Sequence, residues 1–190
     1  MIKVAITGNI ASGKTLVQKI LEEYKYKVLD TDILGHEVIK TSSELRDVFS
    51  EYEVFENDGS ISRTKLGKLV FSDDELKNKL ESISHPIIRN KILEFFAKNQ
   101  SESAVFVAIP LLFEAGMQNL FDKIVLVYSD DEIRKQRLIN RNNYSNDYAN
   151  RRMMSQMPQE RKIGLSDYII YNNADIENLK SQVLKLCSLF

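Results

Sequence analysis

Short, nearly continuous apolar runs alternate along the chain with longer segments whose apolar residues recur at helical spacing. Continuous apolar character is typical of strands that are covered on both faces of a parallel sheet. Strands that alternate with helices in this way are typical of an α/β protein. The pattern therefore predicts an α/β fold with a five-stranded parallel sheet. The predicted strands are Lys3–Thr7, Lys27–Leu29, Ala104–Ile109, Lys123–Val127 and Tyr168–Ile170.

The stretch between the second and third predicted strands is too long for one crossover connection, and its pattern is mostly helical. Hydroxyl side chains before Glu44 can cap a helix that starts near that residue. Asn57–Ser60 is typical of a turn, and His85-Pro86 is expected to open a helix that runs as far as Lys98. This stretch is therefore predicted to form a helical subdomain inserted beside the sheet.

The residues that follow the first predicted strand, Gly8-Asn9-Ile10-Ala11-Ser12-Gly13-Lys14-Thr15, fit the phosphate-binding loop G-x-x-x-x-G-K-[ST]. The glycines let backbone N–H groups approach phosphate oxygens, and a helix predicted over Leu16–Tyr24 adds the positive end of its dipole. Lys14 is expected to lie against the β- and γ-phosphates, and the Thr15 hydroxyl to bind Mg²⁺. A glycine-rich turn without a ligand is the alternative. The flanking strand and helix favour a site for a nucleoside triphosphate.

A second group of polar residues, Asp30-Thr31-Asp32, follows the second predicted strand. Ligands of an open parallel sheet bind beyond the carboxyl ends of its strands, so these carboxylates are expected to face the phosphate loop. If the strand continues through them, Asp30 and Asp32 project to the same side. Asp32 is our candidate for a base that orients an acceptor hydroxyl and takes its proton. A role for Asp32 in capping the next helix is the alternative.

A basic run at residues 134–143 follows the fourth predicted strand. Arg137 and Arg141 are four residues apart and so share one helical face. Guanidinium groups bind pairs of oxygens and stabilise charge on a transferring phosphoryl group. We interpret residues 137–158 as a lid that excludes water as a competing acceptor. A solvated basic face is the alternative.

Composition restricts the partners and the compartment. Lys and Arg total 26 against 27 Asp and Glu, so no overall field favours nucleic acid or a membrane surface. The longest apolar run, Ala104–Phe113, contains Pro110 and is too short to span a bilayer. A single cysteine, Cys187, excludes an intramolecular disulfide and is compatible with a reducing compartment. Because a predicted core strand begins at once, no signal peptide is expected, and the protein is predicted to be cytoplasmic.

Taken in order, these motifs resemble the dephospho-CoA kinase family over nearly the whole chain. Asp30-Thr31-Asp32 stands where the family usually has Asp-Ala-Asp, and Pro110-Leu111-Leu112-Phe113-Glu114 matches its most distinctive string. The other matching segments are the phosphate loop, Asp58–Arg63, Leu66-Gly67, Val70-Phe71, His85–Ile88, Gln136–Arg141, Gln156 and Ser166–Asn173. The resemblance implies a three-layer P-loop kinase fold with a helical substrate-binding insertion and a lid.

The resemblance also implies a reaction and a domain plan. Members of the family transfer a phosphoryl group from ATP, with Mg²⁺, to the ribose 3′-hydroxyl of dephospho-CoA and so form coenzyme A. For this chain it implies one domain, residues 1–190, with a core at 1–32 and 104–190 and the acceptor-binding insertion at 33–103. The expected partner is the small molecule dephospho-CoA, with no nucleic acid or membrane, and the expected state is a monomer or a weak homo-oligomer.

Carried over residue by residue, the resemblance implies a set of roles. The ATP site is expected to comprise Asn9, Ala11, Ser12, Gly13, Lys14, Thr15 and Leu16, with Asn172 near the adenine. The catalytic residues are expected to be Asp32 as the base, with Lys14, Arg137 and Arg141 holding charge. The dephospho-CoA side is expected to comprise Asp32, Arg63, His85, Arg89 and Glu114. For His85 a structural role is the alternative, and for Glu114 an ion pair with a site arginine.

Four positions depart from the usual family pattern. Leu16 replaces Thr and so lacks a hydroxyl near the α-phosphate, while its backbone N–H remains. Ser62 and Asn142 each replace Asp and so remove charges that could orient Arg63 and Arg141. Ala174 replaces Gly, and alanine tolerates a positive φ poorly.

Two other functions fit parts of the pattern. A P-loop kinase that acts on shikimate, gluconate or a nucleoside needs the same loop, carboxylates and arginines. The long insertion and the Pro-Leu-Leu-Phe-Glu string favour a large acceptor instead. A nucleotide-binding switch is the second alternative, but no Asn-Lys-x-Asp motif for guanine occurs, since Asn90-Lys91-Ile92-Leu93 lacks the Asp.

Overall fold

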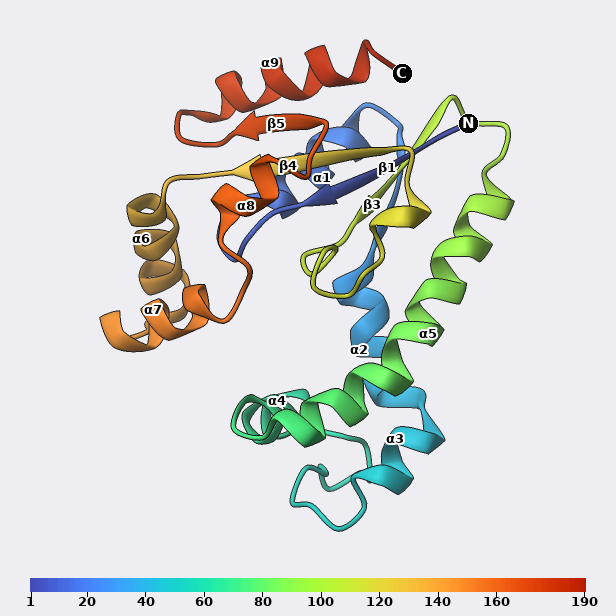
Figure 1. The fold of residues 1–190 in the computed structure, drawn as a ribbon, viewed down its shortest axis with the longest axis vertical. Coiled ribbons are helices and arrows are strands. Elements are labelled where there is room, and N and C mark those ends of the chain that lie inside the picture. The colour runs from blue at the N-terminus through green and yellow to red at the C-terminus, as the bar shows by residue number, and fades with distance from the viewer. The chain divides into compact units, whose positions relative to one another are not determined.

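The computed structural model describes every residue from Met1 to Phe190. Five strands form one parallel sheet with the order β2-β3-β1-β4-β5 (Figure 1). The strands are β1 (Ile2–Thr7), β2 (Lys27–Asp30), β3 (Ala104–Ala108), β4 (Lys123–Tyr128) and β5 (Tyr168–Tyr171). The predicted α/β fold and all five predicted strands are therefore confirmed.

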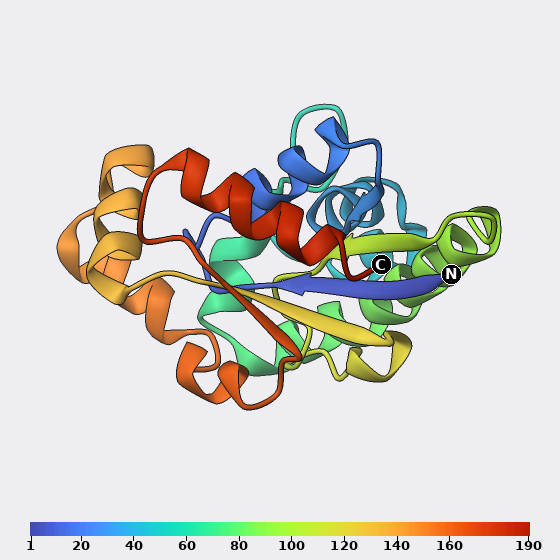
Figure 2. The same cartoon turned by 90° about the horizontal axis from the view of Figure 1, so that it is seen from above.

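One face of the sheet is covered by two helices that are far apart in the sequence. These helices are α1 (Lys14–Glu23) and α9 (Ile176–Cys187), and Figure 2 shows them on one side of the sheet with α8 (Gln159–Ile163) on the other. Because side chains alternate along a strand, only every second residue of β1 faces α1 and α9. The shared core includes Val4, Ile6, Val17, Ile20, Leu21, Phe106, Val125, Val127, Leu179 and Val183. This core fixes β1 and α1 together, so it also fixes the ends of the loop between them.

The chain leaves β4 through Ser129 and Asp130 and enters a helical region. It consists of α6 (Asp131–Asn142), α7 (Asn146–Met154) and then α8, and it includes the residues predicted to form a lid. A short 3₁₀ helix, η1 (Gln118–Leu120), precedes β4. Since all strands are parallel, the segments that follow β1, β4 and β5 lie at the same edge of the sheet. None of the helices has the length and apolar character needed to cross a membrane.

The chain divides into two compact units, one formed by Met1–Asp30 with Phe96–Phe190 and the other by Thr31–Phe95. The second unit contains α2 (Thr31–Thr41), α3 (Ser43–Val48), α4 (Arg63–Phe71) and most of α5 (Asp74–Lys98). It has a hydrophobic core of its own, which consists of Val38, Leu45, Phe49, Val54, Ile61, Leu66 and Leu76.

Two local features of the second unit agree with the sequence pattern. The Ser42 hydroxyl accepts a hydrogen bond from the Leu45 N–H at 3.2 Å and so caps α3. In the turn predicted at Asn57–Ser60, the Asp58 carboxylate accepts hydrogen bonds from the Ser60 hydroxyl at 2.6 Å and the Ser60 N–H at 2.9 Å. These bonds lower the pKa of Asp58, the hydroxyl having the larger effect.

The predicted start of one helix is wrong. The sequence predicted a helix that opens at His85-Pro86, whereas α5 begins at Asp74 and continues through Pro86. The Asp73 carboxylate accepts hydrogen bonds from the N–H groups of Glu75 and Leu76 and so starts the helix earlier. Apolar residues on both sides of the proline, Leu76, Leu80, Ile83 and Ile87, pack into the core of this unit. Their packing offsets the backbone hydrogen bond that a proline removes.

We predict that the Cys187 thiol reacts slowly in the native protein. Cys187 lies at the end of α9, and its burial raises the pKa of the thiol, which reduces the thiolate fraction at any given pH. The reaction with an aromatic disulfide at pH 8 should be slower in the native protein than in urea by at least about tenfold. The Cys187→Ala variant, which has no thiol, gives the background signal of the assay. Equal rates in the two states would contradict the burial of this helix end.

Candidate active site

The loop between β1 and α1 requires glycine at both of its ends. A Cβ on Gly8 would lie 2.6 Å from the Val127 carbonyl oxygen of the neighbouring strand β4. Gly13 has a φ of 99°, and a Cβ on it would collide with the side-chain amide of Asn172. The first glycine therefore permits close packing on β4, and the second permits the backbone turn into α1.

The N-terminus of α1 has neither a capping side chain nor an acidic residue in its first turn. Its N-cap, Gly13, provides no side-chain hydrogen bond, and its first turn holds no acidic residue. The first N–H groups of a helix have no partner within it. The Ser12 hydroxyl is also buried and has no hydrogen-bond partner in the protein. These groups fit an incoming phosphate, which can accept hydrogen bonds from all of them.

The next three residues of the motif differ in exposure. The Lys14 side chain is almost wholly buried, whereas Thr15 is exposed in the first turn of α1. Leu16 is 37% exposed, and its N–H donates a hydrogen bond of 2.9 Å to the Gly13 carbonyl oxygen. No group of three or more His, Cys, Asp or Glu side chains could hold a metal ion.

Three consecutive carbonyl oxygens of the loop accept hydrogen bonds from side chains outside it. Arg134 donates to the Ile10 oxygen at 3.3 Å, and Arg137 donates to the Ala11 oxygen at 3.4 Å. Asn172, which follows β5, donates to the Ser12 oxygen at 2.8 Å. The loop is thus held from its outer side by α6 and by the end of β5.

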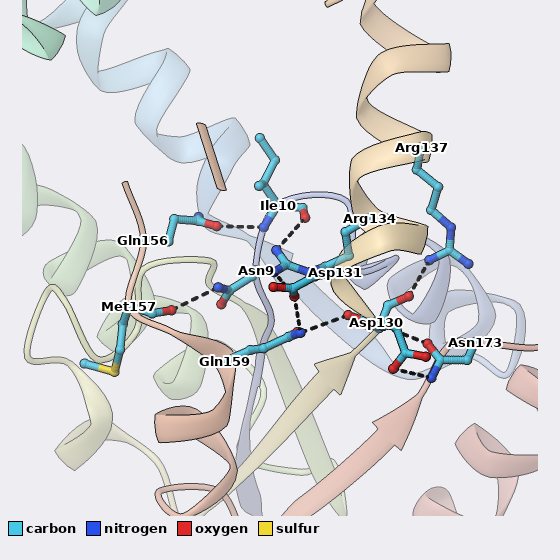
Figure 3. A network of polar contacts seen from close by, with 11 residues as sticks. Asn9, Ile10, Asp130, Asp131, Arg134, Arg137, Gln156, Met157, Gln159 and Asn173 are labelled. Atoms are coloured by element: carbon cyan, nitrogen blue, oxygen red, sulfur yellow. Dashed lines mark hydrogen bonds and ion pairs between the residues drawn. The ribbon is translucent and has the colours of Figure 1, made fainter. Parts of the chain in front are cut away.

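The segment between α7 and α8 holds the start of the loop. The Gln156 side-chain oxygen accepts a hydrogen bond from the Ile10 N–H at 2.7 Å, and Asn9 donates to the Met157 carbonyl oxygen at 2.9 Å (Figure 3). At the start of α8, Gln159 donates to the Ser129 carbonyl oxygen at 3.0 Å and to Asp131 at 2.7 Å. These contacts tie the loop, the segment before α8 and the start of α6 into one polar network.

Both predicted lid arginines lie on α6, but their surroundings differ. Arg137 donates to the Ser129 hydroxyl at 3.1 Å and to the Asn172 carbonyl oxygen at 3.0 Å, in addition to Ala11. Arg141 is exposed, and its Nε donates to the Asn142 side-chain oxygen at 2.9 Å. Asn142 thus still orients Arg141 although it lacks the charge of the usual Asp. The catalytic roles of both arginines stay predictions.

The predicted adenine contact, Asn172, is buried, and its side-chain amide lies against the loop rather than in solvent. Its neighbour Asn173 exchanges two hydrogen bonds of 2.9 Å with Asp130, one from the Asp130 N–H and one to its carboxylate (Figure 3). Ala174 is not among the residues with a positive φ. Alanine therefore fits this position as well as glycine does.

Four residues predicted on the acceptor side belong to the second unit. The strand does not continue through Asp32, because β2 ends at Asp30 and Thr31 begins α2. Asp32 is an exposed carboxylate in the first turn of α2. Arg63 is the first residue of α4, which Ser62 caps as an Asp could. His85 and Arg89 are four residues apart on α5 and so share a helical face.

Glu114, the fifth predicted acceptor residue, belongs to the sheet unit. It forms an ion pair, but with Lys162 of α8 and not with an arginine, at 2.9 Å. The sequence did not single out Lys162, nor Ser129, Asp131 and Gln159 of the polar network. Asp131 also pairs with Arg134 three residues on, but the contacts of Gln159 with Ser129 and of Lys162 with Glu114 join residues far apart along the chain, so no local pattern could have pointed to them.

The parallel sheet and the phosphate loop together define a P-loop protein of the kinase fold. The family model for dephospho-CoA kinase matches residues 2–178. A dephospho-CoA kinase of Oceanobacillus iheyensis is 36% identical over 95% of this chain and 93% of its own length. The chain therefore belongs to the dephospho-CoA kinase family.

Solved structures agree with this family. A protein of Thermus thermophilus is 33% identical to this chain with a TM-score of 0.86, and covers 100% of this chain and 98% of its own. A dephospho-CoA kinase from Campylobacter jejuni is 31% identical with a TM-score of 0.75, and the match covers 98% of this chain and 95% of the other. The likeness thus includes both units of the chain.

We predict that Gly13→Ala weakens ATP binding by at least about tenfold, because strain at a positive φ costs about 1–3 kcal/mol and the added methyl collides with Asn172. Titration calorimetry with ATP measures this loss. The matched control is Gly59→Ala, because Gly59 has a φ of 77° but open space around its Cβ position. The control should bind ATP normally, and equal losses in both variants would point to general destabilisation.

Proposed function

We propose that this chain transfers the γ-phosphoryl group of ATP to the ribose 3′-hydroxyl of dephospho-CoA, giving coenzyme A and ADP. The observation that carries the proposal is an intact phosphate loop in a chain that belongs to the dephospho-CoA kinase family over nearly its whole length. The N-terminus of α1, free of acidic residues, supports a polyanionic ligand at this loop.

In the proposed mechanism the loop positions the phosphates of ATP. Backbone N–H groups at the start of α1 bind phosphate oxygens, and the Lys14 ammonium holds charge on the β- and γ-phosphates. The Thr15 hydroxyl would bind Mg²⁺, which neutralises phosphate charge when it is bound. Arg141, exposed on α6, would hold further charge on the transferring group, and Arg137 would do so from its place beside the loop.

Asp32 is the proposed base. It follows the carboxyl end of β2 by two residues, and β2 is two strands away from β1. At the usual strand spacing, the ends of these two strands are about 10 Å apart across the sheet. The carboxyl end of β2 lies at the edge of the sheet where ligands of an open parallel sheet bind. A carboxylate there can orient the 3′-hydroxyl and accept its proton.

The other proposed contacts to dephospho-CoA are Arg63, His85 and Arg89. Cationic side chains suit the phosphates of this substrate, and His85 with Arg89 shares one face of α5. We further propose that the protein acts in the cytoplasm as a monomer or a weak homo-oligomer. The lone, buried Cys187 is compatible with that reducing compartment.

Product analysis tests the proposed reaction. Purified protein, ATP and MgCl₂ would be incubated with dephospho-CoA and, in parallel, with shikimate, gluconate or adenosine, and the products measured by mass spectrometry. We expect equal amounts of ADP and coenzyme A with dephospho-CoA alone. ADP formed only with another acceptor would point to a different small-molecule kinase. ATP binding without any acceptor-dependent product would favour a nucleotide-binding switch.

We predict that Asp32→Asn lowers kcat by about 100-fold or more and leaves the affinity for ATP nearly unchanged, because the amide cannot accept the proton. Steady-state kinetics and ATP titration give the two values. The matched control is Asp74→Asn, which removes a first-turn carboxylate from α5 as Asp32→Asn does from α2. Turnover of Asp32→Asn at the level of this control would remove Asp32 from its proposed role.

A further inference from the structure

Lys162 and Glu114 form a deeply buried lysine–carboxylate pair. The Lys162 side chain is 0% exposed and the Glu114 side chain 25%, and Lys162 Nζ lies 2.9 Å from Glu114 Oε1. Six further lysine–carboxylate pairs are much more exposed. A buried ammonium requires a counter-charge, so removing either partner leaves the other uncompensated.

The same carboxylate oxygen also holds the segment that contacts the phosphate loop. Glu114 Oε1 accepts a hydrogen bond from the Met157 N–H at 3.0 Å. The Met157 carbonyl oxygen, on the other side of that residue, accepts the hydrogen bond of 2.9 Å from Asn9. Gln156, immediately before Met157, binds the Ile10 N–H (Figure 3). A continuous set of polar contacts therefore leads from Lys162 through Glu114 and Met157 to the loop.

Helix α8 can hold this set of contacts in place because the start of the helix is itself fixed. Gln159, its first residue, is buried and binds the Ser129 carbonyl oxygen and the Asp131 carboxylate (Figure 3). Lys162 is the fourth residue of the same short helix and carries its one buried charge. The position of Met157 is thus determined by a fixed helix and a charge pair, both within the sheet unit.

We propose that Glu114 and Lys162 are positioning residues for the ATP phosphates: the buried pair holds Gln156 and Met157 where they fix Asn9 and Ile10 of the phosphate loop. This inference rests on the proposed kinase function. It moves Glu114 from the acceptor side of the site to the ATP side. Neither residue needs to touch a substrate, because both act through the backbone of Met157.

The experiment compares Glu114→Gln, Lys162→Met and the double variant. Glutamine keeps an oxygen for the Met157 N–H and removes only the charge, whereas methionine keeps most of the lysine stem. We expect each single variant to bind ATP about tenfold more weakly and to raise KM for ATP, while KM for dephospho-CoA stays within about twofold. The double variant should lose no more affinity for ATP than the single variant that binds ATP more weakly, because the two residues act as one unit.

The control is the exposed pair Lys123–Asp167, whose geometry is matched. Its nitrogen–oxygen distance is 3.2 Å, and the Asp167 carboxylate also accepts a backbone N–H, that of Ile124, at 2.8 Å. This pair lies at the amino ends of β4 and β5, whereas the phosphate loop follows the carboxyl end of β1. Lys123→Met and Asp167→Asn should therefore leave ATP binding unchanged.

The outcomes separate the two proposals. ATP binding is measured without an acceptor, so it is independent of whether dephospho-CoA is the substrate. Unchanged ATP affinity in Glu114→Gln and Lys162→Met would overturn the positioning role. If only the KM for dephospho-CoA rises, that role is also overturned, and Glu114 acts on the dephospho-CoA side as the sequence predicted. Thermal unfolding is recorded for each variant. If neither the single variants nor the double variant folds, the pair supports the fold as a whole, and the proposal fails.

Discussion

The carbonyl oxygens of Ile10, Ala11 and Ser12 are bound from outside the phosphate loop by Arg134, Arg137 and Asn172. A trans peptide unit is planar, so its N–H points away from its C=O. Donors that bind these carbonyls therefore turn the N–H groups of the following residues toward the opposite side, where we propose that a phosphate binds. The Ser12 N–H is used within the loop, by the Asn9 oxygen at 3.0 Å. The geometry of the anion site thus depends on side chains that need not touch the anion.

Two of these donors are guanidinium groups, and their charges are balanced differently. Arg134 is buried and paired with Asp131 at 2.6 Å, so its charge is compensated locally. The three hydrogen bonds of Arg137 go to neutral oxygens, those of Ala11, Ser129 and Asn172. Arg137 is half-buried, and its positive charge therefore remains available to a polyanion at the loop. One arginine thus fixes the loop, and the other can contribute charge to the site as well.

Features that depend on neighbouring residues could be predicted from the sequence. The five strands, the phosphate loop and the Ser42 cap are of this kind, since strand pattern, glycine spacing and capping are local. Packing within the second unit could not be predicted from the sequence. Because of this packing, α5 continues through Pro86. The contacts that hold the loop were also missed, because Asn9 and Met157 are 148 residues apart. Glu114 was singled out by its motif, but its partner Lys162 lies in a segment without any motif.

Helix α1, the proposed phosphate-binding helix, is stabilised in a different way from the other helices of the sheet unit. Helices α6, α7, α8 and α9 each carry an acidic residue in the first turn, which their dipoles favour. Helix α1 has no such residue, and Gly13 gives it no side-chain cap. Val17, Ile20 and Leu21 are instead almost completely buried against the sheet. Because apolar burial holds α1 in place, its N-terminus needs no anionic side chain, and this agrees with the phosphate site that we propose there.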